Sequence, residues 1–549
     1  MAKEKMTVAA AMVKALEKEG IKHIFGYPGA AICPFFDELL HSEIKSILVR
    51  HEVNGGHAAG AYARVTGKPA VCVATSGPGA TNLITAVASA HMDSIPIIAI
   101  TGQVVSSLVG RDAFQEADIT GACEPFVKHS YLVKNAESIG EVIKKAFYIA
   151  GTGRPGPVLI DVPMDIQKQE IEFEYPETVE IRSYKPSFSG NKLQIKKAAE
   201  ALRNSSKPLI CAGGGVIAAM AREELRRLSE MCDIPVVSTM MGIGAISTEH
   251  RNYYGMIGVF GVTTAKLALK ECDLLIVLGA RMSDRSVTDS EVFEGTTVIH
   301  IDVDPAEIGK NSRVNIPIVG DVKKITEQFT EELDDMKHTE WQDMLRQSRL
   351  SGGEKAADGL CCHNAAYVNP QFFIKALCSA LPSKCVICSD VGSNQIWAAN
   401  NVELTAEGRF ITSGGMGTMG YALPAAVGAK TADGSAEVVA LCGDGSFQMC
   451  FMELATAIQH NINIKIAVFV NNYLGMVREL QDNNYSGRRT MVDLSGSPDF
   501  LKLAEAYGIA GETVYTDKEA EEAVKRMAAS DKPYLLQVMV DPTEKSLIE

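Results

Sequence analysis

Two polar residues at the ends of apolar runs have the types and spacing to do chemistry. Asp444 lies in the turn Gly443-Asp444-Gly445-Ser446, directly after the apolar run 438–442. Asn471 follows 27 residues later, at the end of a second apolar run, 464–470. Carboxylate and amide oxygens suit Mg²⁺, and glycines let backbone N–H groups approach a phosphate closely. The pattern predicts a Mg²⁺–diphosphate site.

The residues between these positions predict the elements that would hold them. A helical pattern separates the two apolar runs, at Met452, Leu454, Ala455 and Ile458. The stretch 437–481 is therefore typical of a strand, turn, helix and strand in a parallel sheet. Such sheets bind ligands beyond the carboxyl ends of their strands. The alternative is an ordinary strand-end turn without a ligand, but the second polar residue at the next strand end favours a site.

The composition excludes several classes of protein. A length of 549 residues predicts three or four domains, and 46% hydrophobic residues are ordinary for a globular protein. The net charge of −14, without a basic block, argues against nucleic acid or an anionic membrane as partner. We expect no signal peptide and no membrane span. The thirteen scattered cysteines indicate core thiols of a reducing cytoplasm.

Alternation of strand-like and helical segments predicts an α/β protein with three doubly wound parallel-sheet domains, at residues 1–170, 190–340 and 368–549. We expect strands of the first domain at 23–25, 47–49, 70–74, 95–101 and 157–162. Those of the second are expected at 208–212, 235–238, 273–279, 298–303 and 316–319. Those of the third are expected at 386–389, 438–442, 464–470 and 534–540. Residues 171–188 indicate a linker, and 331–364 an exposed helix and linker.

The second domain contains a candidate nucleotide site. Gly213-Gly214-Gly215 opens a predicted helix, which could receive a pyrophosphate. Asp302 at a strand end could hold a ribose hydroxyl, and Asp321 is a second candidate. Glycine turns between strands and helices are common, so this signal is weak by itself.

Glu52 is the most informative residue of the first domain. It follows the short strand 47–49 and precedes a small-residue helix, 55–64. Alone, it would be an exposed Glu at a helix start, stabilised by the helix dipole. However, Arg50-His51-Glu52, Thr75-Ser76-Gly77-Pro78-Gly79 and Gly443-Asp444-Gly445 resemble thiamine diphosphate enzymes. The resemblance is closest to the catalytic (large) subunits of acetolactate synthase, also called acetohydroxyacid synthase, and it runs from about residue 5 to 541.

This resemblance implies a three-domain enzyme, with pyrimidine-binding, FAD-binding-like and diphosphate-binding domains. It implies that Asp444, Asn471 and the carbonyl of Tyr473 hold Mg²⁺. It implies that Glu52 hydrogen-bonds a pyrimidine nitrogen, that Met419 props the bent cofactor, and that Gly417 offers its carbonyl to the exocyclic amine. The other implied thiamine diphosphate contacts are Gly29, Ser76, Asn394, Gly443, Gly445 and Ser446.

The resemblance also implies substrate and flavin contacts. Arg285 would pair with the carboxylate of a second keto acid, a contact that suits its planar fork. Gln115 would act in catalysis, and the pocket would include Ala30, Phe114, Met476 and Leu480. Arg281 would contact the flavin of FAD, alongside Gly213, Gly214, Gly215, Asp302 and Asp321.

The implied reaction is the decarboxylation of pyruvate on thiamine diphosphate. The hydroxyethyl enamine then condenses with pyruvate or 2-ketobutyrate, giving 2-acetolactate or 2-aceto-2-hydroxybutyrate for branched-chain amino acid biosynthesis. The implied assembly is a homodimer or homotetramer, with Glu52 from one subunit and the metal ligands from the other. A small regulatory subunit is a further implied partner, and its presence and valine feedback are left open.

Four departures from the family affect these expectations. Leu480 replaces a Trp that in the family shapes the pocket for 2-ketobutyrate, so we do not expect a strong preference for that substrate. Met164 replaces a Lys and Val259-Phe260 replaces a Met-His pair, which weakens the expectation of FAD. Asn394 replaces a His, and the tail after Asp541 is short. Another thiamine diphosphate carboligase or decarboxylase, a flavin-independent form, or a non-catalytic binding homologue therefore stay as alternatives.

Overall fold

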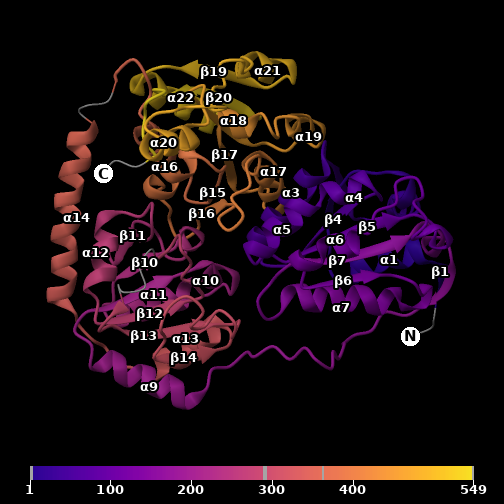
Figure 1. Cartoon of the computed structure of the whole chain (residues 1–549), viewed down its shortest axis with the longest axis horizontal. Coiled ribbons are helices and arrows are strands. Elements are labelled where there is room, and N and C mark those ends of the chain that lie inside the picture. Colours follow the sequence, from indigo (N-terminus) through magenta and orange to yellow (C-terminus); the bar gives the residue numbers. More distant parts are fainter. Residues whose placement is uncertain (1–3, 288–292, 361–363, 547–549) are drawn as a thin grey trace. The chain divides into compact units, whose positions relative to one another are not determined.

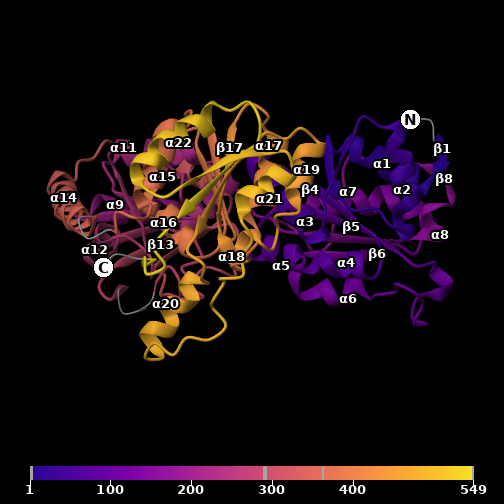
Figure 2. The same ribbon diagram turned by 90° about the horizontal axis from the view of Figure 1, so that it is seen from above.

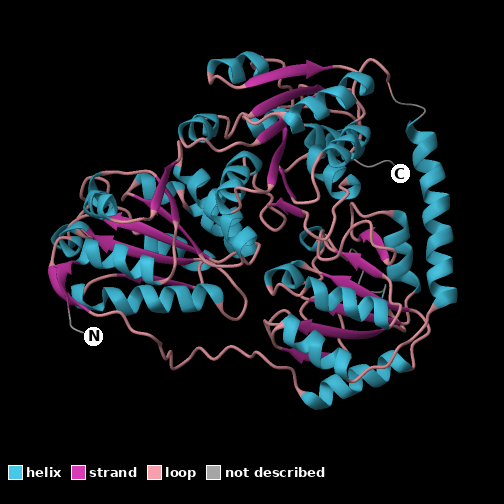
Figure 3. Cartoon of the chain, turned by 180° about the vertical axis from the view of Figure 1, so that it is seen from behind, coloured by secondary structure: helices cyan, strands magenta, loops and turns pink. Residues whose placement is uncertain are grey.

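The computed structural model describes residues 4–287, 293–360 and 364–546, and these form two compact units. The first unit comprises residues 1–185, 413–438 and 449–464, and the second comprises 186–412, 439–448 and 465–549. Three six-stranded parallel sheets, each flanked by helices, confirm the predicted fold class (Figure 3). The predicted boundaries at 170, 190, 340 and 368 stay predictions.

The sheet of the first unit has the strand order β3-β2-β4-β5-β7-β6. Its strands are β2 (His23–Gly26), β3 (Lys45–Leu48), β4 (Ala70–Ala74), β5 (Ile97–Gln103), β6 (His129–Leu132) and β7 (Val158–Pro163). Figure 1 labels four of these strands, β4, β5, β6 and β7. Helices α1 (Val8–Lys18) and α7 (Ile139–Gly151) pack an apolar core against one face. The predicted strands are present, but β6 was missed because this edge strand is polar and half-buried. An antiparallel pair, β1 (Glu4–Thr7) and β8 (Glu170–Phe173), was missed as well.

Helix α3 (Glu52–Thr66) lies on the other face of this sheet, and nine of its 15 residues are buried. It packs against α5 (Ile84–Met92) and α17 (Ala422–Ala432). The contact is so close that a Cβ at Gly428 would lie 1.9 Å from the Ala58 carbonyl oxygen. This explains the small residues of α3. The helix begins three residues earlier than predicted, because His51 caps it by accepting a hydrogen bond from Val53 N at 3.4 Å. Glu52 is thus in its first turn.

The second unit contains the other two sheets. The middle sheet has the order β11-β10-β9-β12-β13-β14, from β9 (Pro208–Ala212), β10 (Val236–Ser238), β11 (Tyr253–Met256), β12 (Leu274–Leu278), β13 (Thr297–Asp302) and β14 (Ile316–Val319). The C-terminal sheet has the order β16-β15-β17-β18-β20-β19, from β15 (Cys385–Ser389), β16 (Arg409–Thr412), β17 (Glu437–Gly443), β18 (Lys465–Val470), β19 (Ala510–Val514) and β20 (Tyr534–Met539). The predictions missed β11, β16 and β19, and each of these is an edge strand.

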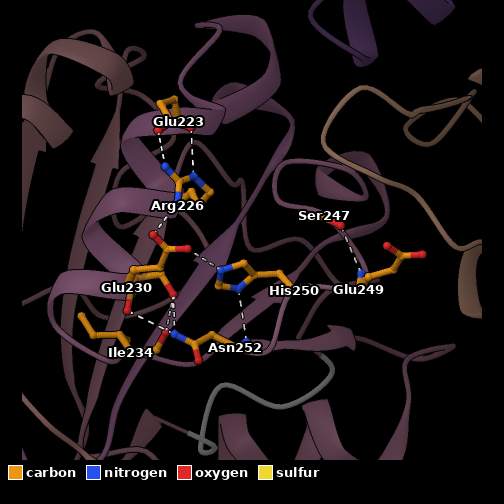
Figure 4. Close-up of polar contacts among 9 residues, drawn as sticks. Glu223, Arg226, Glu230, Ile234, Ser247, Glu249, His250 and Asn252 are labelled. Atoms are coloured by element: carbon orange, nitrogen blue, oxygen red, sulfur yellow. Dashed lines mark hydrogen bonds and ion pairs between the residues drawn. The ribbon is translucent and has the colours of Figure 1, made fainter. Parts of the chain in front are cut away.

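A polar cluster holds the segment that leads into β11 (Figure 4). Arg226 and Glu230 of α11 (Arg222–Met231) form an ion pair, and Glu230 also contacts His250 Nε2 at 3.1 Å. His250 Nδ1 accepts a hydrogen bond from Asn252 N at 3.2 Å, and Asn252 Nδ2 donates to Ser229 O at the same distance. These side-chain contacts, rather than an apolar run, therefore anchor the approach to this edge strand.

The prediction of an exposed helix and linker at 331–364 was partly wrong. Helix α14 (Thr339–Leu360) does form, but its first turns are buried at Trp341, Gln342 and Leu345. Trp341 Nε1 donates to Pro208 O at 2.9 Å, and Gln342 Oε1 accepts from the Tyr254 hydroxyl at 2.7 Å. Because this segment is mostly polar, its sequence did not indicate that the first turns of α14 pack against the middle domain.

The burial of most described cysteines agrees with the prediction that they are core thiols. No disulfide joins the eleven cysteines within the described residues, and nine of these cysteines are buried. Cys361 and Cys362 lie outside those residues. In the part of the chain that the structure covers, no helix is both long and apolar enough to cross a membrane.

Candidate active site

Asp444 lies at the carboxyl end of β17 and begins the short helix α18 (Asp444–Phe447). The predicted sharp turn is thus a helical turn. The carboxylate is 3% exposed and accepts hydrogen bonds from Asn472 N at 2.7 Å, Gly445 N at 2.9 Å and Asn471 N at 3.1 Å. Burial raises the pKa of Asp444 to about 6, and these hydrogen bonds oppose the rise. The carboxylate is therefore fixed in place.

Asn471 and Tyr473 complete the predicted ligand set. Strands β17 and β18 are parallel neighbours with Gly443 opposite Phe469, which brings Asn471 beside Asp444. Asn471 Oδ1 accepts a hydrogen bond from Tyr473 N at 3.0 Å, so residues 471–473 form a tight turn. Among the described residues, no cationic side chain forms an ion pair with Asp444. A buried carboxylate beside amide and carbonyl oxygens fits the donor set that Mg²⁺ prefers.

The residues predicted to hold the diphosphate also hold this turn together. Ser446 Oγ accepts from Gly443 N and donates to Gly443 O, both at 3.1 Å. Asn394, in α16 (Ser393–Asn401), donates through Nδ2 to Asp390 O at 2.8 Å and Leu441 O at 3.3 Å. Gly443 and Gly445 flank Asp444. Direct contacts of these residues with a diphosphate stay a prediction.

Glu52 lies between His51 and Val53, two residues that line a cavity of the first unit. Its Oε2 accepts a hydrogen bond from Asn82 Nδ2 at 2.9 Å. Asn82, Met419, Gly420 and His57 line this cavity, which has a volume of about 300 Å³. Met419 thus shares a cavity with the partner of Glu52, two residues after Gly417. Asn82 was not predicted as a site residue, because only the fold shows that it reaches Glu52.

We expect His57, which lines this cavity, to make the stability of the fold depend on pH. It is buried, and its ring packs edge-on against Tyr421 with centroids 5.1 Å apart. Burial lowers its pKa to about 4. Between pH 6.5 and 4 the unfolded chain binds a proton at His57 that the folded chain excludes. The free energy of unfolding therefore decreases as the pH is lowered, by up to about 1.4 kcal/mol per pH unit.

We expect His57→Phe to make this acid-side loss of stability shallower, because the ring contact is kept and the titrating group is removed. Thermal unfolding midpoints of both proteins, measured from pH 7 to 4, check the prediction. The exposed His41→Asn is the control and should keep the wild-type slope. An unchanged slope in His57→Phe would contradict the assignment.

The remaining predicted residues of the first unit follow its strands. Gly29 and Ala30 come after β2, and Ser76, which is buried, comes after β4. Gln115 adopts the left-handed conformation at φ 58° and contacts Gly77 closely, whereas Phe114 is 88% exposed. The carboxyl edge of this sheet therefore carries the predicted residues, but their contacts with ligands stay untested.

The middle domain offers a structural reason for part of the predicted flavin site. Gly213 caps α10 (Gly214–Ala218), and a Cβ at Gly213 would lie 2.1 Å from Gly279 O. The glycines at 213 and 215 thus allow close packing against residues 279–280. Asp302 is buried at the end of β13, and Asp321 caps α13 (Val322–Glu331) by accepting from Lys324 N at 3.0 Å. These roles hold whether or not FAD binds.

The two predicted arginines lie after β12, in the segment that follows Gly279. Arg281 is half-buried, and its carbonyl accepts a hydrogen bond from Asn311 Nδ2 at 3.3 Å. Arg285 is exposed, beside the carboxylate of its neighbour Asp284 at 3.7 Å. The guanidinium of Arg285 is therefore accessible to an anion.

Three family models match the chain, one in each domain. They are described as the N-terminal TPP binding domain, the central domain and the C-terminal TPP binding domain of thiamine pyrophosphate enzymes, and they match residues 6–122, 195–329 and 390–538. The chain is 45% identical to the probable acetolactate synthase large subunit of Methanocaldococcus jannaschii, covering 98% of this chain and 93% of the relative. It is 42% identical to that of Corynebacterium glutamicum, covering 98% and 87%, and 40% identical to that of Haemophilus influenzae, covering 98% and 96%. The chain belongs to the acetolactate synthase large-subunit family.

Membership of the acetolactate synthase large-subunit family confirms the predicted resemblance. The chain is an enzyme of the thiamine pyrophosphate class, and the TPP-binding domains agree with the predicted thiamine diphosphate cofactor. Within this family, Asp444 and Asn471 fall in the C-terminal TPP binding domain and Glu52 in the N-terminal one.

The region around Leu480, a predicted residue of the substrate pocket, is partly exposed. Met476 and Leu480 lie on α20 (Gly475–Asn484), which in Figure 2 extends away from strand β17. Met476 is half-buried and Leu480 is 50% exposed. The last described residues dock on this region, because Ser546 N donates to Glu479 Oε2 at 3.0 Å and Trp397 Nε1 donates to Lys545 O at 2.8 Å. Residues 545–546 thus reach α20 and α16.

Proposed function

We propose that this protein is the catalytic subunit of acetolactate synthase. It decarboxylates pyruvate and joins the remaining two-carbon unit to a second 2-keto acid, giving 2-acetolactate or 2-aceto-2-hydroxybutyrate in branched-chain amino acid biosynthesis. The observation that carries the proposal is the fixed Asp444 carboxylate beside Asn471, in a chain whose relatives are named acetolactate synthase over nearly its whole length. The same relatives favour this activity over other carboligations and over a non-catalytic role.

The chain's residues divide the work between binding and proton transfer. Asp444, Asn471 and the Tyr473 carbonyl would hold Mg²⁺, with residues 443–446 at the diphosphate. Bound thiamine diphosphate supplies a nucleophilic carbon and an electron sink for decarboxylation. Glu52, oriented by Asn82, holds a proton at the pyrimidine nitrogen. The exposed Arg285 guanidinium pairs with the carboxylate of the second acid.

Two further features belong to this proposal. Glu52 and Asp444 lie in different units, and we propose a homodimer or homotetramer in which one subunit supplies Glu52 and another supplies Asp444. FAD would lie against residues 213–215, Arg281, Asp302 and Asp321 and would serve a structural role. The protein would act in the cytoplasm, with a small regulatory subunit as its protein partner.

The test is an assay of purified protein with pyruvate, Mg²⁺ and thiamine diphosphate. We expect 2-acetolactate to form and expect a chelator to abolish its formation. Release of acetaldehyde without acetolactate would instead favour the decarboxylase alternative, and absence of any product would contradict the proposal. An absorbance spectrum of the unheated protein, recorded in parallel, decides whether a flavin is bound.

Leu480 sets an expectation for the choice of second substrate. We expect the wild type to discriminate weakly between pyruvate and 2-ketobutyrate, and Leu480→Trp to raise the preference for 2-ketobutyrate by roughly 10-fold. An apolar contact of this kind typically contributes about 1–3 kcal/mol to the discrimination between two substrates. Competition between the two acids, read as the ratio of products, measures the effect. Tyr485→Trp, just after α20, should leave the ratio unchanged, and a strong 2-ketobutyrate preference in the wild type would contradict this interpretation.

A further inference from the structure

One face of helix α19 (Glu453–Gln459) holds the segment that carries Glu52. Glu453 Oε1 accepts hydrogen bonds from Arg50 N at 2.8 Å and from Asn54 Nδ2 at 2.9 Å. One helical turn later, Thr456 Oγ1 donates to Leu48 O at 3.1 Å. Directly after the helix, His460 Nε2 accepts from Leu48 N at 3.0 Å. These side chains belong to the first unit and are separated from the residues that they bind by about 400 positions in the sequence.

The burial of Glu453 indicates that its carboxylate has a function in this place. The side chain is 1% exposed, and no cationic side chain pairs with it among the described residues. Burial raises the pKa of Glu453, and hydrogen bonds from Thr456, Asn54 and Arg50 oppose the rise. Burying a carboxylate without a cation costs free energy, and the hydrogen bonds that it accepts offset part of that cost. Here two of those bonds reach the segment around Glu52.

The two bonds bracket Glu52. Arg50 lies two residues before it and Asn54 two residues after it, and a single oxygen of Glu453 binds both. Binding on both sides fixes the last residues before α3 and its first turn. Because Glu52 is the first residue of α3, the direction of its side chain is set by this turn. The bond from Asn82 then holds the carboxylate itself.

We infer that Glu453 is a positioning residue for Glu52, holding the turn between β3 and α3 so that the Glu52 carboxylate points to its proton-transfer partner. The inference rests on the proposed function, since it assigns Glu453 a role in that reaction through Glu52. Glu453 itself does not touch substrate or cofactor.

The main experiment compares Glu453→Ala and Glu453→Gln. Glu453→Ala should lower kcat by about 10–100-fold, because a displacement of about 1 Å at a reacting group can cost this much. Glu453→Gln keeps an oxygen for Arg50 and Asn54, and Thr456 can accept from the new amide, so its kcat should stay within about threefold of the wild type. Gln459→Ala is the matched control, since Gln459 binds the Arg50 side chain at 2.5 Å rather than the backbone, and it should retain wild-type kcat.

Two further readouts separate positioning from general stability. In the cofactor-free protein, amide hydrogen exchange in Glu453→Ala should rise at residues 48–54 and stay unchanged elsewhere. In a Glu52→Gln background, Glu453→Ala should cause no further loss of turnover, because both changes act through the same group. The exchange measurement does not depend on acetolactate formation, so it fails independently of the proposed function.

Several results would overturn the inference. They are wild-type turnover in Glu453→Ala, an equal loss in the Glu52→Gln background, a uniform rise in exchange, or a loss in Glu453→Gln as large as that in Glu453→Ala. If Glu453→Ala does not fold, Glu453→Asp tests the inference instead. The shorter side chain moves the carboxylate away from Arg50 N and Asn54 Nδ2 by the length of one methylene group. Glu453→Asp should then lower kcat with raised exchange at 48–54, and wild-type values for both would reject the inference.

Discussion

Replacement of Glu52 by Gln is expected to lower acetolactate turnover by about 10²–10³-fold while thiamine diphosphate stays bound. Glutamine is similar in shape and can still accept the hydrogen bond from Asn82 Nδ2. It cannot exchange a proton with the pyrimidine nitrogen, and general acid–base catalysis typically contributes about 10²–10⁴-fold. Steady-state turnover and equilibrium cofactor binding, measured on the same preparation, check both parts of the prediction.

The matched control for this variant is Glu141→Gln. Glu141 is also an acidic residue in the first turn of a helix, α7, so the change removes the same charge near a helix N-terminus. It is exposed and pairs with Lys145 at 2.5 Å, and its loss should leave turnover unchanged. Normal turnover in Glu52→Gln would reject the assigned role of Glu52.

Replacement of Asp444 by Asn is expected to weaken Mg²⁺-dependent cofactor binding by about 100-fold or more and to abolish turnover. The change removes the only acidic member of the predicted ligand set. It also turns one amide nitrogen toward backbone N–H groups that now donate to the carboxylate. In the wild type, a cofactor at 100 times its Kd stabilises the fold by about 2.7 kcal/mol, and this stabilisation should disappear in the variant.

Titration calorimetry and thermal unfolding, each with and without Mg²⁺ and thiamine diphosphate, measure this effect. Asp493→Asn is the control, because Asp493 is exposed in the segment that pairs with Tyr473. Its cofactor binding should match the wild type. Wild-type Mg²⁺-dependent binding in Asp444→Asn would show that the metal lies elsewhere.

The two variants together test the proposed assembly. If each site takes Glu52 from one subunit and Asp444 from another, a mixed dimer of the two variants has one site with both residues intact. Co-expression should then recover up to about a quarter of wild-type turnover, because half of the dimers are mixed and each has one complete site. No recovery from mixed dimers would place both residues of a site in the same subunit.

The central strands and the strand ends that carry Asp444 and Asn471 could be predicted from the sequence alone. Strands buried on both faces of a parallel sheet are near-continuous apolar runs, so β4, β9 and β18 were recognisable from composition. Asp444 and Asn471 follow such runs, and parallel pairing brings the ends of neighbouring strands together. The glycines around Asp444 and the small residues of α3 were likewise visible as local patterns.

Only the tertiary structure decided which distant residues meet. The edge strands β6, β11, β16 and β19 were missed because each is only four or five residues long and contains no run of more than two apolar residues. The bonds from Asn82 to Glu52 and from Glu453 to Arg50 and Asn54 join segments that no sequence period relates. Hydrogen bonds act over about 3 Å, whereas periodicity reports only whether a side chain is buried. The sequence by itself therefore determined the central strands and the residue types of the predicted metal site, and the fold determined what holds Glu52.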